Sequence, residues 1–491
     1  MAPYIRASFP LKITSAIFNV ELTIHRQFLW LFSLLERELP MSARARISFS
    51  VTVLAAGFLF TGPVSGQSLK AAVEQTLQTN PDVLADANRR LSTDEALKAA
   101  RGGYLPKVDL AVGTGREWTD NATTRFAGGT SLLTRNEGSL TLNQMLFDGD
   151  QVKSEVDRNQ ARVESAAHKL GGTSEQTALR VIEAYLEVLR NRDLVVLTTA
   201  NAEVHLRTFD QIKIRSDSGV GRKADLEQIG ARQGLAKANL TSSEANLRDA
   251  EINFLRVVGR APVNLDKVEG PAASLIPPSL EAALKTAIDN HPTLKSARAD
   301  FDAANAQIAG AKSTMAPRLD LQLGTTINSN IDGVEGRNDS RFAMLRLRWN
   351  LFNGGSDTAR LNETVALSGE AREIMNRTHR QVDQSTRLSW NAMTSAQLRM
   401  PSLRQHAEAS ALTRDAYTKQ FSIGQRTLLD MLDSENETFT AASNYVNGQY
   451  LEVFAKYRVL ADMGQLLTAL GVAPRPESML ATSVSNTTAK N

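Results

Sequence analysis

The chain has 491 residues, no cysteine, and 56 basic against 53 acidic side chains. Residues 1–66 carry six of the basic and three of the acidic ones, so residues 67–491 hold 50 of each and have no net charge. A neutral chain gives no reason to expect a nucleic-acid partner. The absence of cysteine excludes disulfides, thiolate metal sites and a lipid-bearing cysteine.

Residues 41–66 have the pattern of an export signal. Basic residues follow Met41, an apolar run covers 47–60, and small residues precede Gln67. This pattern is typical of a cleaved secretory signal, so we expect the mature chain to begin near Gln67. Residues 1–40 are interpreted as an over-extended start, and 1–66 together as a leader. Export without cysteine suits the periplasm or outer membrane of a Gram-negative cell.

The remaining sequence is a tandem duplication. Residues 68–114 match 279–325 at a constant offset of 211, and Leu146-Phe-Asp-Gly149 returns as Leu351-Phe-Asn-Gly354. This period is far longer than the roughly 20–50 residues of a solenoid repeat, so each copy is a whole structural half. We expect a first repeat over 67–270, a second over 271–475, and a disordered tail over 476–491.

Each copy begins with a helical segment, at 68–104 and 279–315. Pro81 and Pro292 predict a break near the start of a helix in each segment, because proline is tolerated at the first helical position.

Strands follow in each copy. Apolar Val108, Leu110 and Val112 alternate with polar or small residues, and the later copy repeats the alternation over 319–323 and 345–351. Polar links at 117–138 and 328–340 predict one hairpin per copy. Four strands cannot close a membrane barrel, which needs about eight. Either several chains pool their hairpins, or the strands form a small soluble sheet.

Very long helices come next. Helical spacing of apolar residues covers 151–216 and 222–258, and the second copy repeats the plan at about 356–421 and 427–470. Such lengths predict coiled-coil-like packing. Pro401 lies inside the third of these helices, and we expect it to kink or break that helix.

Catalytic chemistry has no support in the sequence. The histidines show no metal-ligand spacing, and no nucleotide loop or nucleophile motif is present. We therefore expect that the protein is not an enzyme and that it binds neither a cofactor nor a metal ion. The six histidines are His25, His168, His205, His291, His379 and His406.

This plan resembles the TolC family of outer-membrane exit ducts over residues 68–470. The most specific match is the stretch from Phe421 to Asp433, and Gly219–Glu227 is its counterpart in the first copy. The resemblance implies a mostly α fold in which three chains pool four strands each into a twelve-stranded β-barrel. Long coiled-coil helices would continue this barrel as a hollow α-barrel across the periplasm, with both helix turns at its periplasmic mouth.

The resemblance places a gate at these turns. Asp430 and Asp433 are three residues apart on a helix, so a trimer would set six carboxylates in a narrow, cation-selective ring. A solvated acidic pair near a helix start is the alternative. Arg426 and Glu227 would form a latch between helices. The family often has tyrosine where this chain has Phe421. Phenylalanine has no hydroxyl, so the hydrogen bond that such a tyrosine could make is absent here.

The turn tips would meet partner proteins. By resemblance these tips contact a periplasmic adaptor (membrane fusion protein), which joins the duct to an inner-membrane ABC or other transporter. Gly219–Glu227 is more similar to ducts of type I protein secretion than to drug-efflux ducts. A periplasmic coiled-coil scaffold or adaptor without a channel is the competing interpretation. The tip residues are Val220, Gly221, Arg222, Ile423, Gly424 and Gln425.

Overall fold

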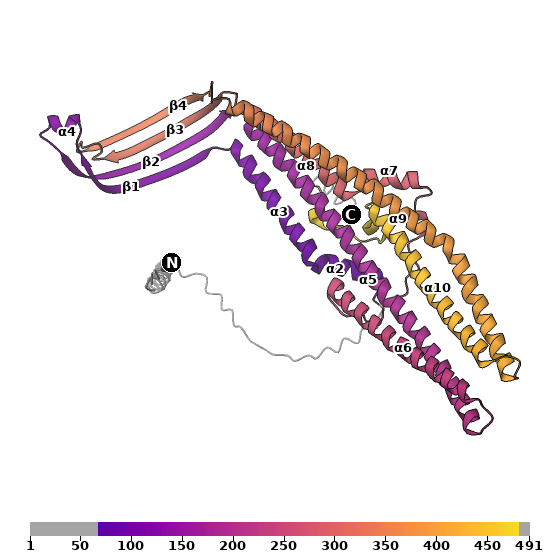
Figure 1. Ribbon diagram of the computed structural model, residues 1–491. Helices are drawn as coiled ribbons and strands as arrows, with labels where there is room; N and C mark the ends of the chain where they lie inside the picture. Colours follow the sequence, from indigo (N-terminus) through magenta and orange to yellow (C-terminus); the bar gives the residue numbers. More distant parts are fainter. Residues whose placement is uncertain (1–66, 481–491) are drawn as a thin grey trace, which may run out of the picture. The chain divides into compact units, whose positions relative to one another are not determined.

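The computed structural model describes residues 67–480 (Figure 1). The predicted leader at 1–66 and the part of the predicted tail from 481 onward lie outside the described residues. The first residues of that predicted tail form the short 3-10 helix η3 (Pro476–Ser478), and the neighbouring Arg475 donates a hydrogen bond of 3.1 Å to the carbonyl of Leu77.

The first helices of the two copies are broken at matching prolines, as expected. The first copy has α2 (Leu69–Thr79) and α3 (Pro81–Arg101), followed by η1 (Gly102–Tyr104). The second copy has η2 (Ala273–Leu275), α7 (Leu280–Asn290) and α8 (Pro292–Ser313). Pro81 and Pro292 each occupy the start of the second helix, where the missing N–H has no partner to lose.

The four strands form one antiparallel sheet in the order β1-β2-β3-β4. The first hairpin pairs β1 (Lys107–Thr119) with β2 (Ser131–Phe147), and its link contains α4 (Ala122–Phe126). The second pairs β3 (Arg318–Ser329) with β4 (Arg337–Arg348). Pairing of β2 with β3 joins the two copies. The prediction of one hairpin per copy is confirmed.

The strand boundaries differ from those expected. Polar residues of the predicted link 117–138 pair within the ladder, as in Asn136 opposite Thr114, so the real link is shorter. The link predicted at 328–340 shortens in the same way, because Asn338 pairs with Asn328. At the other end, Trp349 and Leu351 lie beyond β4 and not in it. Ladder hydrogen bonds involve the backbone, and therefore polar side chains do not end a strand.

A left-handed turn leads from each hairpin into a long helix. Gly149 and Asp150 have φ of 67° and 69°, and the matching Gly354 and Gly355 have φ of 58° and 81°. In the first copy the buried Asp148 carboxylate accepts the N–H groups of Gln151 and Val152, at 3.1 and 2.9 Å. The duplicated Leu-Phe-(Asp/Asn)-Gly motif thus turns the chain from sheet to helix.

The long helices are α5 (Gln151–Asp217) and α9 (Ser356–Ser422), with 67 residues each. After each long helix the chain turns and returns along a shorter one, α6 (Lys223–Val258) in the first copy and α10 (Leu428–Asp462) in the second. The helix predicted over 427–470 ends early because Gly464 takes φ of 67°, and a separate turn of helix, α11 (Leu466–Ala469), follows. No helix among residues 67–480 is long and apolar enough to cross a membrane.

Pro401 does not break α9. The helix is continuous across this residue, so of the expected kink or break the break is wrong, and the kink stays a prediction. Proline removes one backbone hydrogen bond and crowds the carbonyl of the residue four positions before it. Here the helix extends for more than ten residues on both sides, and α10 packs beside the proline, as in the bond of 3.2 Å from Arg404 to the Tyr445 hydroxyl.

Both copies contribute to the main hydrophobic core, which surrounds the middle of α5. The start of α5 packs beside α3 and α8, as in the bond from Thr173 to Asp86, and its later part lies against α6 and α10. Tyr185 is fully buried there. Its hydroxyl donates to the carbonyls of Gln67 and Asp266, at 2.6 and 2.8 Å, so the core also ties down the first described residue.

Candidate functional site

The turns between the long helices lie at the end of α5 and α9 opposite the sheet (Figure 1). Val220 and Ile423 project from these turns with 85% and 68% of their surface exposed. Gly424 has φ of 78°, as expected of a tight turn. In the first turn the positive φ belongs to Gly219 instead of Gly221. A Cβ on Gly221 would approach the Ser216 nitrogen to 2.8 Å, so Gly221 permits close backbone contact.

Asp430 caps the start of α10. The Thr427 N–H and hydroxyl donate to its carboxylate at 3.1 and 2.9 Å, and its own N–H donates to the Thr427 hydroxyl at 3.2 Å. This reciprocal arrangement is a capping box. The two bonds from Thr427, helped by the charge of Arg426, lower the pKa of the Asp430 carboxyl below its usual value. Asp430 is therefore a stable anion at the helix start.

Asp433 has a different partner. Its carboxylate lies 2.9 Å from a guanidinium nitrogen of Arg232, which belongs to α6 in the first copy. The two acidic residues are neighbours on one helix, yet one is bound within its own turn and the other across the copies. Asp430 agrees with the alternative of an acidic residue stabilised at a helix start, whereas Asp433, although 59% exposed, has a cationic partner in the other copy.

Arg426 and Glu227 are not brought together within one chain. The Arg426 guanidinium lies 4.1 Å from the centre of the Tyr417 ring and donates a bond of 3.1 Å to Gln420. Both contacts are with the end of α9. Glu227 is exposed on α6, and among residues 67–480 it has no ion pair. A latch between these two residues would have to form between neighbouring chains.

Phe421 belongs to an apolar cluster that joins the two helix pairs near their turns. The Arg215 guanidinium lies 5.7 Å above its ring. Sequence reasoning missed this cluster, although apolar residues three apart, at Leu226 and Ile229 and again at Leu428 and Met431, were a signal. We call it the turn cluster; it consists of Ile212, Ile229, Leu428, Met431 and Leu432 with the partly buried Phe209, Leu226 and Phe421.

Two buried ionisable groups lie near this cluster. Glu435 on α10 faces the Arg414 guanidinium at 4.0 Å, and burial raises the pKa of its carboxyl although Arg414 opposes the shift. His205 on α5 is buried, and burial with the nearby charge of Arg232 lowers the pKa of its imidazole. Within the described residues no group of three or more His, Asp or Glu side chains is placed to hold a metal ion.

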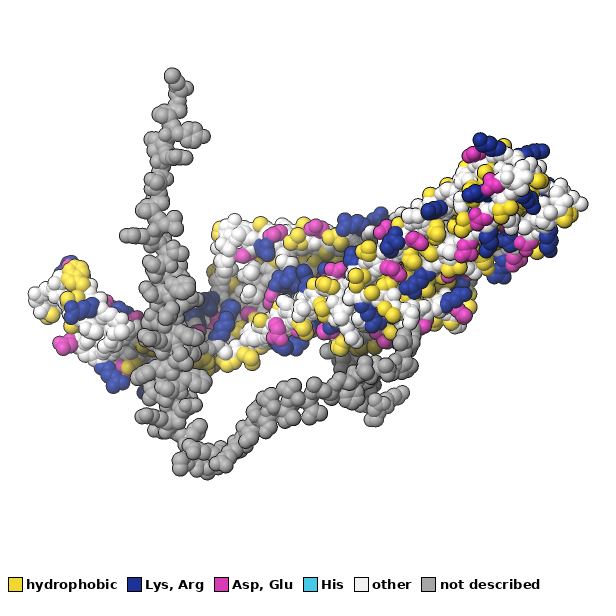
Figure 2. All heavy atoms as spheres, turned by 90° about the horizontal axis from the view of Figure 1, so that it is seen from below, with side chains coloured by type: hydrophobic (Ala, Val, Ile, Leu, Met, Phe, Trp, Pro, Cys, Tyr) yellow, Lys and Arg dark blue, Asp and Glu magenta, His cyan; other side chains and the backbone are white. Residues whose placement is uncertain are grey.

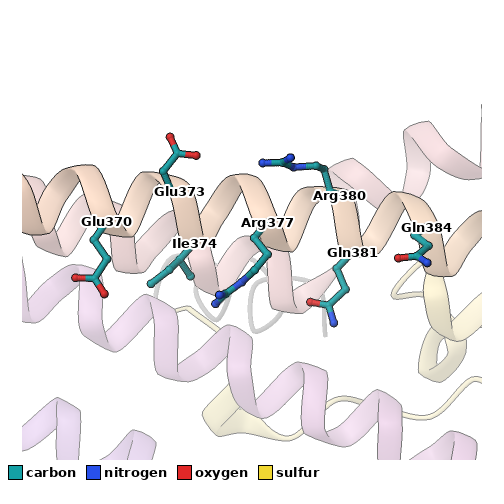
Figure 3. Close-up of a pocket in the computed structure, with 7 residues that line it drawn as sticks. All are labelled: Glu370, Glu373, Ile374, Arg377, Arg380, Gln381 and Gln384. Atoms are coloured by element: carbon teal, nitrogen blue, oxygen red, sulfur yellow. The ribbon is translucent and has the colours of Figure 1, made fainter.

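An open groove of about 890 Å³ runs along the middle of α9 (Figure 3). Glu373 and Arg380 point away from α5 in this view, whereas Glu370 and Arg377 point toward it. Ligand sites are usually concave and lined by several elements, whereas all the residues that line this groove lie on α9, so it is an open helix face and not a pocket for a small molecule. The lining residues are Glu370, Glu373, Ile374, Arg377, Arg380, Gln381 and Gln384.

The visible helix surface carries interspersed charges of both signs. Figure 2 shows basic and acidic side chains alternating along the helices, with apolar side chains between them. Exposed apolar residues also follow the sheet, where Leu110, Val112 and Leu345 are 73%, 78% and 65% exposed. A monomer rarely leaves so many large apolar side chains in water, so these surfaces are suited to being covered.

Comparison with known proteins agrees with the duplicated plan. A protein-family model described as "Outer membrane efflux protein" matches residues 72–260 and 283–464, one segment in each copy. The outer membrane efflux protein BepC of Brucella suis is 24% identical over 422 residues, covering 85% of this chain and 90% of the relative. The outer membrane protein TolC of Escherichia coli is 24% identical and covers 83% of this chain.

Solved structures share the fold. A membrane protein from Pseudomonas aeruginosa superimposes with a TM-score of 0.72 at 18% identity, covering 82% of this chain and 93% of its own. The CmeC outer membrane channel of Campylobacter jejuni gives 0.70 at 14% identity, with coverage of 85% and 88%. The mostly helical fold with four strands per chain is therefore that of known outer-membrane channels.

Proposed function

The chain belongs to the outer membrane efflux protein family, and from this premise we propose that it is the outer-membrane exit duct of a type I secretion or efflux system. Three copies pool their four-stranded sheets into a barrel in the outer membrane lipid. Their long helices extend into the periplasm as a tunnel that opens at the helix turns. The role is passive transport and uses no catalytic residue and no cofactor.

One observation carries this proposal. Each copy supplies a β-hairpin at one end of a 67-residue helix and a tight turn at the other, and the family match covers both copies. At ~1.5 Å per residue such a helix spans ~100 Å, far more than a globular core can bury. An exposed apolar sheet joined to so long a helix suits a protein that is anchored in lipid and crosses an aqueous space.

The turns are proposed as the periplasmic mouth. Asp430, whose carboxylate stays charged, and Asp433 would line the constriction and favour cations. Arg426 and Glu227 would act as a latch between neighbouring chains, since they do not meet within one chain. An exposed pair of this kind contributes only about 0–1 kcal/mol, which suits a gate that has to open.

The tips are proposed as the contact with other proteins. Val220, Gly221 and Arg222 form one tip and Ile423, Gly424 and Gln425 the other. Both would bind a periplasmic adaptor that connects the duct to an inner-membrane ABC or other transporter. A relative from Pseudomonas aeruginosa, 25% identical, is described as an alkaline protease secretion protein. It supports a protein cargo, as does the sequence of the first turn.

Single-channel recording in planar bilayers tests the function. The chain from Gln67 onward is compared with the Asp430→Ala/Asp433→Ala double variant. We expect a small cation-selective conductance that rises or loses its selectivity in the variant. A well-folded protein that never conducts would contradict the proposal and favour the scaffold or adaptor interpretation, in which the sheet packs without a channel.

A further inference from the structure

We infer that Arg232 is the residue that sets the charge of the constriction and ties its two halves together within each chain. The inference rests on the proposed function and concerns a residue outside the turn motifs. Arg232 lies on α6 in the first copy, whereas its partner Asp433 lies on α10 in the second. The guanidinium nitrogen and the carboxylate oxygen are 2.9 Å apart.

The surroundings of Arg232 keep it available for this one partner. Its side chain is 31% exposed, and the buried His205 of α5 is close enough to feel its charge. Burial and that charge both lower the pKa of the His205 imidazole, which favours its neutral form beside the guanidinium. Among the described residues Asp433 is the acidic side chain paired with Arg232.

Arg426, the basic residue of the second turn, is engaged elsewhere. Arg426 stacks on Tyr417 and bonds to Gln420, both on α9 of its own hairpin. It therefore makes no link from the second copy to the first. Arg232 and Asp433 form an ion pair between the hairpins, beside the apolar turn cluster, where the Arg215 guanidinium meets the uncharged Phe421 ring.

The pair changes the electrostatics of the predicted ring. If both acidic residues of every chain were unpaired, a trimer would present six carboxylates. Pairing with Arg232 offsets the charge of one carboxylate in each chain, and Asp430, whose carboxylate also feels the charge of Arg426, keeps its own. Arg232 is thus a specificity-determining residue, because it sets how strongly the mouth prefers cations over anions. It is also a positioning residue, since it holds α10 to α6.

Selectivity and conductance in planar bilayers separate these two roles. The variants are Arg232→Gln, Asp433→Asn and the two combined. Arg248→Gln is the matched control, because Arg248 lies on the same helix, is exposed and has no ion pair within the described part of the chain. The reversal potential in a salt gradient gives the cation-to-anion permeability ratio.

The pairing predicts a distinctive pattern. Arg232→Gln frees Asp433 and raises the permeability ratio at least twofold, whereas Asp433→Asn leaves an unpaired cation and lowers it by a similar factor. The combined variant restores the wild-type ratio. Conductance rises in all three because the tether is lost, and Arg248→Gln changes neither quantity. If Arg232→Gln leaves the ratio unchanged and the combined variant behaves like Asp433→Asn, the inference is wrong.

A cross-linking measurement keeps the test independent of conduction. The chain has no cysteine, so Arg232→Cys/Asp433→Cys can be treated with a short bis-maleimide without background. We expect an intrachain cross-link, detected by peptide mass, that the Arg248→Cys/Asp433→Cys pair does not form. If the wild type conducts but the Arg232→Cys/Asp433→Cys protein forms no such cross-link, the inference is wrong and the proposed function stands. A cross-linked protein that never conducts would overturn the proposed function.

Discussion

The carboxylate of Glu175, within α5, accepts a hydrogen bond of 2.9 Å from the backbone N–H of Leu466, 291 residues further along the chain. The N–H of Leu467 donates to the same carboxylate at 3.3 Å. Glu175 thereby caps the short helix α11 and fastens the end of the second copy to the long helix of the first. Burial raises the pKa of its carboxyl to about 7, although both N–H groups oppose the shift.

Stability should depend on the protonation of Glu175. Its pKa is raised on folding, so its contribution to stability is full below about pH 4.5 and is lost as pH rises through about 7. We expect Glu175→Gln to remove this pH dependence, which amounts to roughly 3 kcal/mol at most. Apparent thermal midpoints of both proteins between pH 4.5 and 8 measure it. Parallel curves for the two proteins would contradict the assignment.

Gly149 and Gly354 should respond differently to the same substitution. Both have positive φ, so alanine costs about 1–2 kcal/mol of strain at either position. A Cβ on Gly149 would also approach the Ala316 Cβ to 2.4 Å, whereas nothing lies within 4 Å of one on Gly354. Gly149→Ala should therefore destabilise by an additional ~1–3 kcal/mol.

Denaturant midpoints of the two glycine variants measure this difference. Gly354→Ala serves as the control for backbone strain without crowding. Equal losses in the two variants would mean that the contact with Ala316 relaxes without cost.

Truncating the Phe421 side chain should lower the local stability of the helix turns. Its ring packs partly buried in the turn cluster, so Phe421→Ala should cost about 1–3 kcal/mol locally, below the range for a fully buried ring. Phe421→Leu keeps most of the apolar volume and is the matched control. The rate of tryptic cleavage at Arg215, Arg222 and Arg426 reports local opening. Equal cleavage rates in wild type and Phe421→Ala would show that the ring does not hold the turns.

Replacing Pro401 should stabilise α9. The residue is exposed and lies in an unbroken helix, so Pro401→Ala restores a backbone donor without removing buried contacts. We expect a gain of about 1–3 kcal/mol in the free energy of unfolding. The exposed neighbour Ser402→Ala controls for helix propensity alone. A loss of stability in Pro401→Ala would show that the local distortion at the proline is required by its neighbours.

Features that depend on local chemistry were predictable from the sequence. Pro81 and Pro292 mark helix starts because proline tolerates that position, and the repeated Leu-Phe-(Asp/Asn)-Gly motif marks two equivalent junctions. The alternation at Val108, Leu110 and Val112 identified strands. Their ends were misplaced, because ladder bonds between backbones continue through polar residues.

The sequence by itself determined the duplication, the order of helices and hairpins, and the turns where acidic residues gather, since these follow from periodicity and turn chemistry within short stretches. Only the tertiary structure decided which partner each charged residue takes. Asp433 pairs with Arg232, Arg426 stacks on Tyr417 instead of meeting Glu227, and Glu175 binds α11. The first and third of these contacts join residues hundreds of positions apart, and the packing of whole helices selects among partners that a local pattern leaves equivalent.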